Sequence, residues 1–82
     1  MARQSEQVRQ ALRERSAEFR RLEQEHSSYS QQLEALTRKA RPAADEQAEI
    51  ARLKKRKLQA KDRMAEMVRD YRREQAEAVQ AT

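Results

Sequence analysis

The sequence predicts an all-α protein, an antiparallel coiled-coil helical hairpin that is expected to dimerise into a four-helix bundle. Charged residues make up 40% of the chain and glycine is absent, a composition typical of long helices. Apolar residues recur in alternating steps of four and three positions, which is the repeat of a coiled coil. The single proline, Pro42, lies near the middle of the chain, where it interrupts the helix and lets the two halves fold back on each other.

The first helix is expected over residues of about 4–39. Proline disfavours the helical conformation of the residue before it, so this helix should end near Lys39, and its cationic last turn suits the negative end of the helix dipole. We call the positions that the repeat places between the two helices the intramolecular seam. In this half the seam comprises Leu12, Phe19, Leu22, His26, Tyr29, Leu33 and Leu36.

A loop over residues 40–45 and a second helix over residues of about 46–79 complete a single domain, residues 1–82. Asp45 is a suitable N-cap, and Glu46 and Glu49 place negative charge at the positive end of the helix dipole. In this half the seam comprises Ile50, Leu53, Ala60, Met64, Met67 and Tyr71.

The two halves of the seam fit each other when the chain folds back at Pro42. In this register Leu33 meets Leu53 and Leu22 meets Met64, so apolar positions pair with apolar positions. Arg15 falls opposite Tyr71, where its guanidinium group can stack on the ring. A single long helix that is kinked at Pro42 is the main alternative.

A second apolar stripe supports the expected dimer. It consists of Leu58, Ala65 and Val68. Leu58 lies five residues after Leu53, about 140° around the helix, so the stripe points away from the intramolecular seam. One hairpin of this size buries little apolar surface. We therefore expect the stripe to be the oligomer interface.

Basic residues concentrate between residues 52 and 63, in a chain whose net charge is +5. The residues available for contacts with anions or nucleic acid are Arg52, Lys54, Lys55, Arg56, Lys61 and Arg63. Consecutive lysines fan around a helix instead of forming one stripe, and this distribution favours a solvated face. Nonspecific phosphate binding, which needs only charge density, and docking of an acidic protein or an anionic lipid surface remain as alternatives.

The sequence also argues against several classes of function. Cysteine is absent and His26 is the only histidine, so one chain cannot build a zinc site of His and Cys ligands. No nucleophile–histidine–carboxylate set and no glycine loop for phosphates is present. We therefore predict no enzyme activity, no metal and no cofactor. No apolar run approaches the roughly 20 residues that span a bilayer. The lack of cysteine is compatible with a reducing cytoplasm, and we expect a cytoplasmic protein.

Two segments carry a resemblance to a known family. They are "FRRLEQEHSSYSQQLEAL" at residues 19–36 and "LKKRKLQAKDRM" at residues 53–64. Together they resemble the YdcH-like family of short bacterial helical proteins, a domain of unknown function, over residues of roughly 16–68. The departures are Tyr29, Ser30 and Ala60, where the family pattern has Leu, Asp and Leu. The resemblance implies a helical hairpin and a bacterial origin, and it implies no biochemical activity.

These observations predict a non-enzymatic coiled-coil interaction or adaptor module that self-associates, and a helix of another protein is a further candidate partner. The alternative is weak, largely nonspecific nucleic-acid binding through the basic segment, residues 52–63. Salt dependence separates the two, because binding to phosphates weakens steeply as salt rises.

Overall fold

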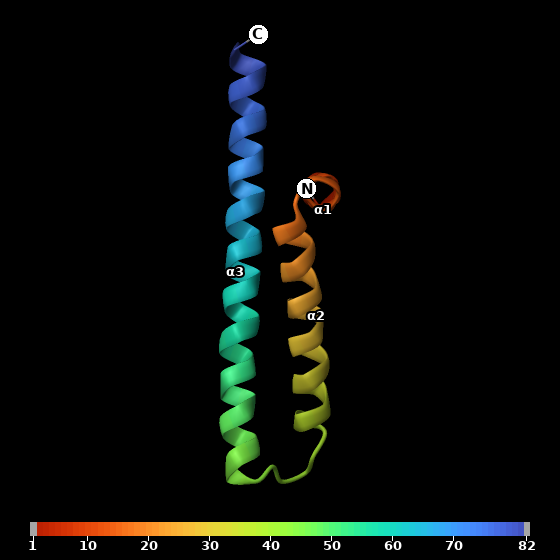
Figure 1. Cartoon of the computed structure of the whole chain (residues 1–82), viewed down its shortest axis with the longest axis vertical. Helices are drawn as coiled ribbons and strands as arrows, with labels where there is room; N and C mark the ends of the chain where they lie inside the picture. Colours follow the sequence, from red (N-terminus) through yellow and green to blue (C-terminus); the bar gives the residue numbers. More distant parts are fainter. Residues whose placement is uncertain (1, 82) are drawn as a thin grey trace.

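The computed structural model describes the backbone of residues 2–81 and the side chains of residues 6–79. Within this span the chain forms three helices, α1 (Ala2–Arg15), α2 (Ala17–Thr37) and α3 (Ala44–Ala81). Figure 1 shows α2 and α3 running antiparallel, side by side, with a loop joining them at one end. The molecule is elongated and measures 59 × 24 × 17 Å. The predicted all-α antiparallel hairpin is confirmed.

The single first helix expected over residues 4–39 is wrong, because the chain breaks it at Ser16 into α1 and α2. Ser16 has an extended backbone, with φ −121° and ψ 113°, and its hydroxyl accepts a hydrogen bond from the backbone N–H of Phe19 at 3.1 Å. Serine forms this N-cap readily because its short side chain reaches the free N–H groups of a first turn. The residue that ends α1 therefore also starts α2.

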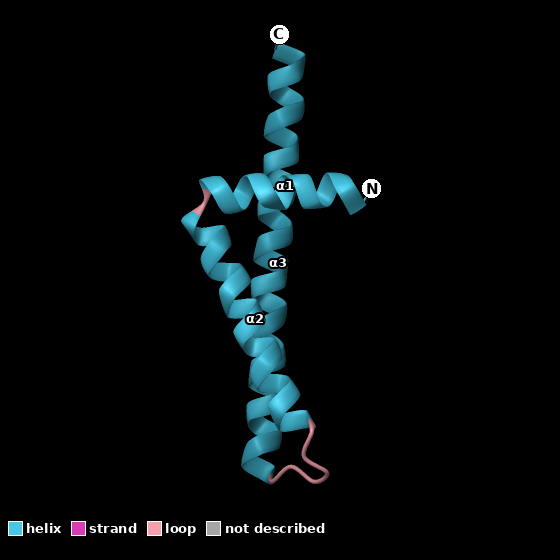
Figure 2. Cartoon of the chain, turned by 90° about the vertical axis from the view of Figure 1, so that its right-hand side faces the viewer, coloured by secondary structure: helices cyan, strands magenta, loops and turns pink. Residues whose placement is uncertain are grey.

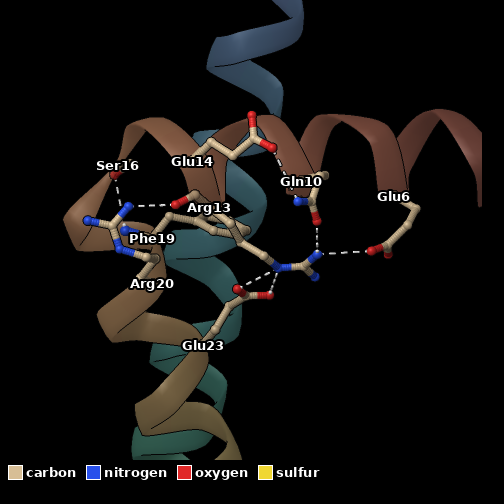
Figure 3. A network of polar contacts seen from close by, with 8 residues as sticks. All are labelled: Glu6, Gln10, Arg13, Glu14, Ser16, Phe19, Arg20 and Glu23. Carbon is tan, nitrogen blue, oxygen red and sulfur yellow. Dashed lines mark hydrogen bonds and ion pairs between the residues drawn. The ribbon is translucent and has the colours of Figure 1, made fainter.

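Three arginine and glutamate side chains hold this corner (Figure 3). Arg20 donates to the backbone carbonyl of Arg13 at 2.6 Å, and so satisfies an acceptor in the last turn of α1. Arg13 in turn donates through Nε to both carboxylate oxygens of Glu23, at 2.8 and 2.9 Å. These bonds connect α1 to α2 at two points, so the change of direction at Ser16 is fixed by contacts on both sides of it.

The bend lets α1 lie across α3 (Figure 2). In a straight first helix the coiled-coil register would place Val8 opposite Ala78, a small side chain in a polar stretch of α3. In the bent chain Leu12 is buried and Val8 packs against the same apolar cluster. Burial of apolar surface drives folding in proportion to the area removed from water, and this gain explains why the helix breaks.

The core lies where the three helices meet. Its buried members are Leu12, Phe19, Leu22, Ala60 and Met64, and Val8, Met67, Val68 and Tyr71 pack against them. Phe19 is fully buried, with 0% of its surface exposed. Nearer the loop, Leu33 and Leu53 are also buried. Toward the other end α3 continues past α1 (Figure 1), and residues 72–79 are exposed.

The loop of residues 38–43 connects α2 to α3. Glu46 organises it, since its carboxylate accepts from the backbone N–H of Ala43 at 3.0 Å and pairs with Lys39. Ala43 occupies the N-cap position, and its carbonyl accepts from the N–H of Gln47 at 2.9 Å. The expected N-cap, Asp45, is therefore wrong and lies in the first turn of α3. The Glu46 side chain supplies the capping bond instead.

The register of the hairpin can be read from one pair at its open end. The guanidinium carbon of Arg15 lies 5.7 Å from the centre of the Tyr71 ring, which is a favourable cation–π distance. This is the pair that the sequence register places opposite each other. The register therefore extends to the last residue of α1, where the chain turns.

We expect Ser16→Ala to lower the free energy of unfolding by about 1 kcal/mol, because the N–H of Phe19 loses its partner. Urea unfolding followed by circular dichroism measures the change. Ser27→Ala is the matched control, since Ser27 is exposed and makes no side-chain hydrogen bond within residues 6–79. Equal losses in the two variants would show that the Ser16 cap does not stabilise the corner.

Candidate functional site

Two of the six basic residues considered for anion binding are engaged within the chain. Arg63 donates to Glu18 of α2 at 2.8 Å and lies 3.2 Å from Glu66. The hydrogen bond from Arg63 lowers the pKa of Glu18. Arg52 pairs with Glu49, one turn earlier in α3, at 2.8 Å. Arg63 thus links the two arms of the hairpin, and Arg52 braces its own helix.

The other four are exposed, and none has an ion-pair or hydrogen-bond partner within the described residues. They are Lys54, Lys55, Arg56 and Lys61. They point to different sides of α3, because Arg56 lines a hollow with Tyr29 and Gln59, whereas Lys54 and Lys61 line another with Leu33. The basic segment is therefore divided between faces of the molecule, as the helical repeat predicts.

The hollow that Lys54 and Lys61 share is a shallow groove between α2 and α3, which we call the docking groove. It has a volume of about 300 Å³ and is lined by Leu33, Lys54, Lys57, Leu58 and Lys61. Leu58 is 56% exposed, an unusual exposure for a large apolar side chain in this molecule. The groove thus combines two leucines with three lysines.

A second groove, which we call the histidine groove, lies where α1, α2 and α3 approach one another. Its volume is about 340 Å³, and it is lined by Arg9, Glu23, His26, Lys57, Lys61 and Met64. Lys57 and Lys61 line both grooves, so the two are neighbours on the same side of α3. The cationic side chains of this face thus converge from two helices that are far apart in the sequence.

His26 is half-buried at the seam in this groove. Its pKa is lowered from the ordinary value of 6.5, first by burial and then by the positive charges of Lys57, Lys61 and Arg9. The nearby carboxylate of Glu23 is held by Arg13, and this contact raises the pKa of Arg13. His26 is therefore neutral at pH 7 and surrounded by fixed cations.

All of the predicted seam residues lie in buried or half-buried positions. Leu12, Phe19, Leu22, Leu33, Leu53, Ala60 and Met64 are buried, and His26, Tyr29, Leu36, Ile50, Met67 and Tyr71 are half-buried. Ala60 faces Leu22 and Tyr29 across a hollow that also admits Gln59. Ala60 is nevertheless buried, with 5% of its surface exposed, and belongs to the core cluster.

The second apolar stripe, proposed as an oligomer interface, does not form one open surface. Val68 packs against the core of the same chain, in the region that α1 crosses, and Ala65 is half-buried. Only Leu58 of the stripe is exposed. The bend at Ser16 is the physical reason, because it brings Val8 and Leu12 of α1 to the core on this part of α3.

The sequence did not predict that Arg9 and Glu23 line the histidine groove, or that Leu33 lines the docking groove. Arg9 reaches the histidine groove only because α1 turns at Ser16, and a continuous helix would carry it away from His26. A signal for the turn is present in the sequence, where Ser16 precedes Ala17 and Glu18. A serine followed by an acidic first turn is a helix-start pattern. Within residues 6–79 no cluster of three or more metal-ligand side chains is formed.

We expect His26→Leu to be more stable than the wild type by about 1 kcal/mol, because an apolar side chain suits the seam better. The folded-state pKa of His26 is lowered, so the unfolded chain binds the proton more readily. Stability is then present above pH 6.5, the ordinary value, and is lost as pH falls from there through the folded-state pKa. The advantage of His26→Leu should therefore widen with acidification.

Urea unfolding of both proteins between about pH 8 and pH 5 measures this difference. His26→Gln serves as the control, since glutamine is polar but does not titrate, and on acidification the wild type should lose stability relative to it by the same amount as relative to His26→Leu. A difference between wild type and both variants that stays constant over this range would contradict the lowered pKa.

Most of the residues that line the two grooves lie in a segment that matches one known protein family. A protein family of unknown function, DUF465, to which the YdcH-like proteins belong, matches residues 19–68. The match includes α2 from its third residue onward, the loop and the basic segment of α3, and it begins after the corner at Ser16. No curated protein and no solved structure matches the chain. The resemblance seen in the sequence is confirmed, and the chain belongs to the DUF465 family of proteins of unknown function.

Proposed function

We propose that this protein is a non-enzymatic interaction module that binds an acidic amphipathic helix of a partner protein in the docking groove. The observation that carries the proposal is the exposed Leu58, which lines a groove together with Leu33 and three lysines. A helix with apolar residues on one face and carboxylates beside them matches both properties of this groove.

The two properties contribute to binding in different ways. Complete burial of a leucine side chain is worth about 1.5–3 kcal/mol, so Leu58 supplies affinity. Lys54, Lys57 and Lys61 surround it without a carboxylate partner within residues 6–79, and exposed charges of this kind steer an oppositely charged partner. When the partner binds, no carboxylate of this chain has to be displaced from these three lysines.

The chemistry of the chain supports a role without catalysis. Cysteine is absent and one histidine is present, and that histidine is held neutral among cations. The serines that make side-chain hydrogen bonds in the described region serve the helices, as Ser16 does for Phe19 and Ser28 for Gln32. No helix within residues 2–81 has the length and apolarity needed to cross a membrane.

Nucleic-acid binding is the second candidate, favoured by the unpaired charges of Lys54, Lys55, Arg56 and Lys61. Their distribution around α3 limits how many can reach one phosphate backbone at once. Arg52 and Arg63 are already paired with carboxylates. Asparagine, which reads adenine edges, is absent from the sequence. These features favour a protein partner over a nucleic acid.

Self-association through Leu58 is part of the proposal and has a distinctive salt dependence. Two copies that bury Leu58 against each other also bring together the lysines beside it, and their repulsion opposes the dimer. Salt screens charges over about 10 Å at 0.1 M and about 3 Å at 1 M. We therefore expect dimerisation to strengthen as sodium chloride rises, as measured by sedimentation velocity.

Leu58→Ser should remove this salt-dependent association and leave a monomer at every salt concentration. Val79→Ser is the matched control, because Val79 is also a largely exposed apolar residue, 74% exposed, but lies outside the docking groove. A dimer that weakens with salt, or one that survives in Leu58→Ser, would rule out an interface centred on Leu58.

The docking proposal is tested with a synthetic helix of Glu, Ala and Leu that has one apolar face. NMR titration of the full chain at low salt should shift the amides of Leu33, Lys54 and Leu58. Leu58→Ser should weaken binding about tenfold, in line with the burial energy of leucine. A peptide of the same composition in scrambled order has no apolar face, so it should bind more weakly.

Single-stranded DNA and RNA form the competing arm of the same titration. A nucleic acid that binds more tightly than the peptide, loses affinity steeply with salt and is insensitive to Leu58→Ser would replace the docking proposal with the second candidate. Lys55→Gln separates general charge from the groove, because it removes one exposed cation outside the docking groove.

A further inference from the structure

The histidine groove has a composition that the proposed docking of a helix does not use. It is lined from all three helices, by Arg9 of α1, by Glu23 and His26 of α2, and by Lys57, Lys61 and Met64 of α3. Lys57 and Lys61 of α3 thus line the same groove as Arg9 of α1. The imidazole of His26, on α2, lines it as well. This convergence exists only in the folded chain.

The cations of this groove lack partners. Within residues 6–79, Arg9, Lys57 and Lys61 form no ion pair or hydrogen bond, and neither does the imidazole of His26. The one acidic residue of the lining, Glu23, accepts both of its close contacts from Nε of Arg13, at 2.8 and 2.9 Å. Its charge is therefore balanced by Arg13, outside the groove lining.

Cationic side chains that line one groove repel one another, and an anion bound between them offsets that repulsion. A tetrahedral oxyanion with two negative charges has enough oxygen atoms to accept from several cationic donors at once. The volume of about 340 Å³ exceeds that of such an ion and its first waters. The size, the sign of the charge and the free donors therefore select the same kind of ligand.

We propose that the histidine groove binds a doubly charged phosphate-like oxyanion, held by Arg9, Lys57 and Lys61, with the protonated imidazole of His26 as a further donor. The site lies beside the docking groove and shares Lys57 and Lys61 with it. Arg9 and His26 belong to this site alone, and Leu58 belongs to the docking groove alone. The two sites can therefore be tested separately.

This arrangement couples the binding of an anion to the protonation of His26. In the free protein burial and the charges of Lys57, Lys61 and Arg9 lower the pKa of His26. Glu23, the acidic group facing it, is already engaged by Arg13. An anion that binds beside the imidazole offsets the repulsion and stabilises the protonated form. The pKa of His26 then rises on binding, and by linkage the anion binds more tightly as pH falls.

The first experiment follows the His26 ring by NMR through a pH titration of the full chain. Sulfate is the probe, because it stays doubly charged over this range, and sodium chloride at equal ionic strength is the reference. We expect a higher pKa for His26 in sulfate than in chloride. The same pKa in both salts would overturn the proposal.

Substitutions then locate the site. Arg9→Gln and Lys61→Gln should each weaken sulfate binding about tenfold, as expected for the loss of a charge-assisted contact. Lys55→Gln is the matched control, because it removes the same charge from an exposed position outside the lining of this groove. Equal weakening in all three variants would show only a response to net charge and would overturn the site.

Two further variants distinguish this proposal from the docking of a helix. Leu58→Ser should weaken peptide binding about tenfold and leave the sulfate-induced shift of the His26 pKa intact. Arg9→Gln should do the reverse, because Arg9 does not line the docking groove. Loss of the sulfate response in Leu58→Ser, with its retention in Arg9→Gln, would contradict the assignment of the anion to the histidine groove.

Inorganic phosphate and glycerol 3-phosphate separate the two sources of the same chemistry. Both carry a phosphate group that is doubly charged above its second pKa of about 6 and keeps one negative charge below it, and both should raise the pKa of His26. Tighter binding of the ester by tenfold or more would indicate a phosphate that is attached to a larger molecule, whereas equal binding would indicate free phosphate. Absence of any response to both ions would overturn the proposal.

Discussion

The packing around Phe19 is the interaction on which the rest of the structure depends. A two-helix hairpin has a narrow seam and buries little apolar surface by itself. In this chain Phe19 is fully buried, in a cluster that includes Leu12 of α1 and Met64 of α3. Leu12 reaches this cluster because the chain turns at Ser16, just before Phe19, and α1 crosses the hairpin there.

Ser16 makes that turn, and the turn determines which polar groups meet. Its hydroxyl caps α2, while the paired side chains of Arg13 and Glu23 connect the two sides of the corner. Because α1 then lies across α3 (Figure 2), Arg9 enters the groove that holds His26. The same crossing brings α1 against the core that Val68 joins. A single cap thus shapes both the cationic site and the surface that remains for partners.

The basic residues divide into structural and available groups according to the carboxylates within their reach. Arg63 meets Glu18 across the hairpin, and Arg52 meets Glu49 one turn away. Lys54, Lys57 and Lys61 find no carboxylate, and they gather around Leu58 and His26. Exposed apolar surface and the repulsion between neighbouring cations both raise the free energy of the unbound chain. A partner that covers Leu58 and supplies carboxylates or phosphates lowers both contributions.

The sequence by itself determined the hairpin, because a strict coiled-coil repeat and one proline leave little freedom for two helices to pair otherwise. It also determined the register, as the stacking of Arg15 on Tyr71 shows, and it carried the family motif at residues 53–64. Only the tertiary structure decided that the first helix breaks at Ser16, that Glu46 replaces Asp45 in capping α3, and that Arg9 lies beside His26. Local periodicity describes contacts between neighbouring turns, whereas these features depend on the apolar area that a third helix can bury, a quantity that exists only once the helices have packed.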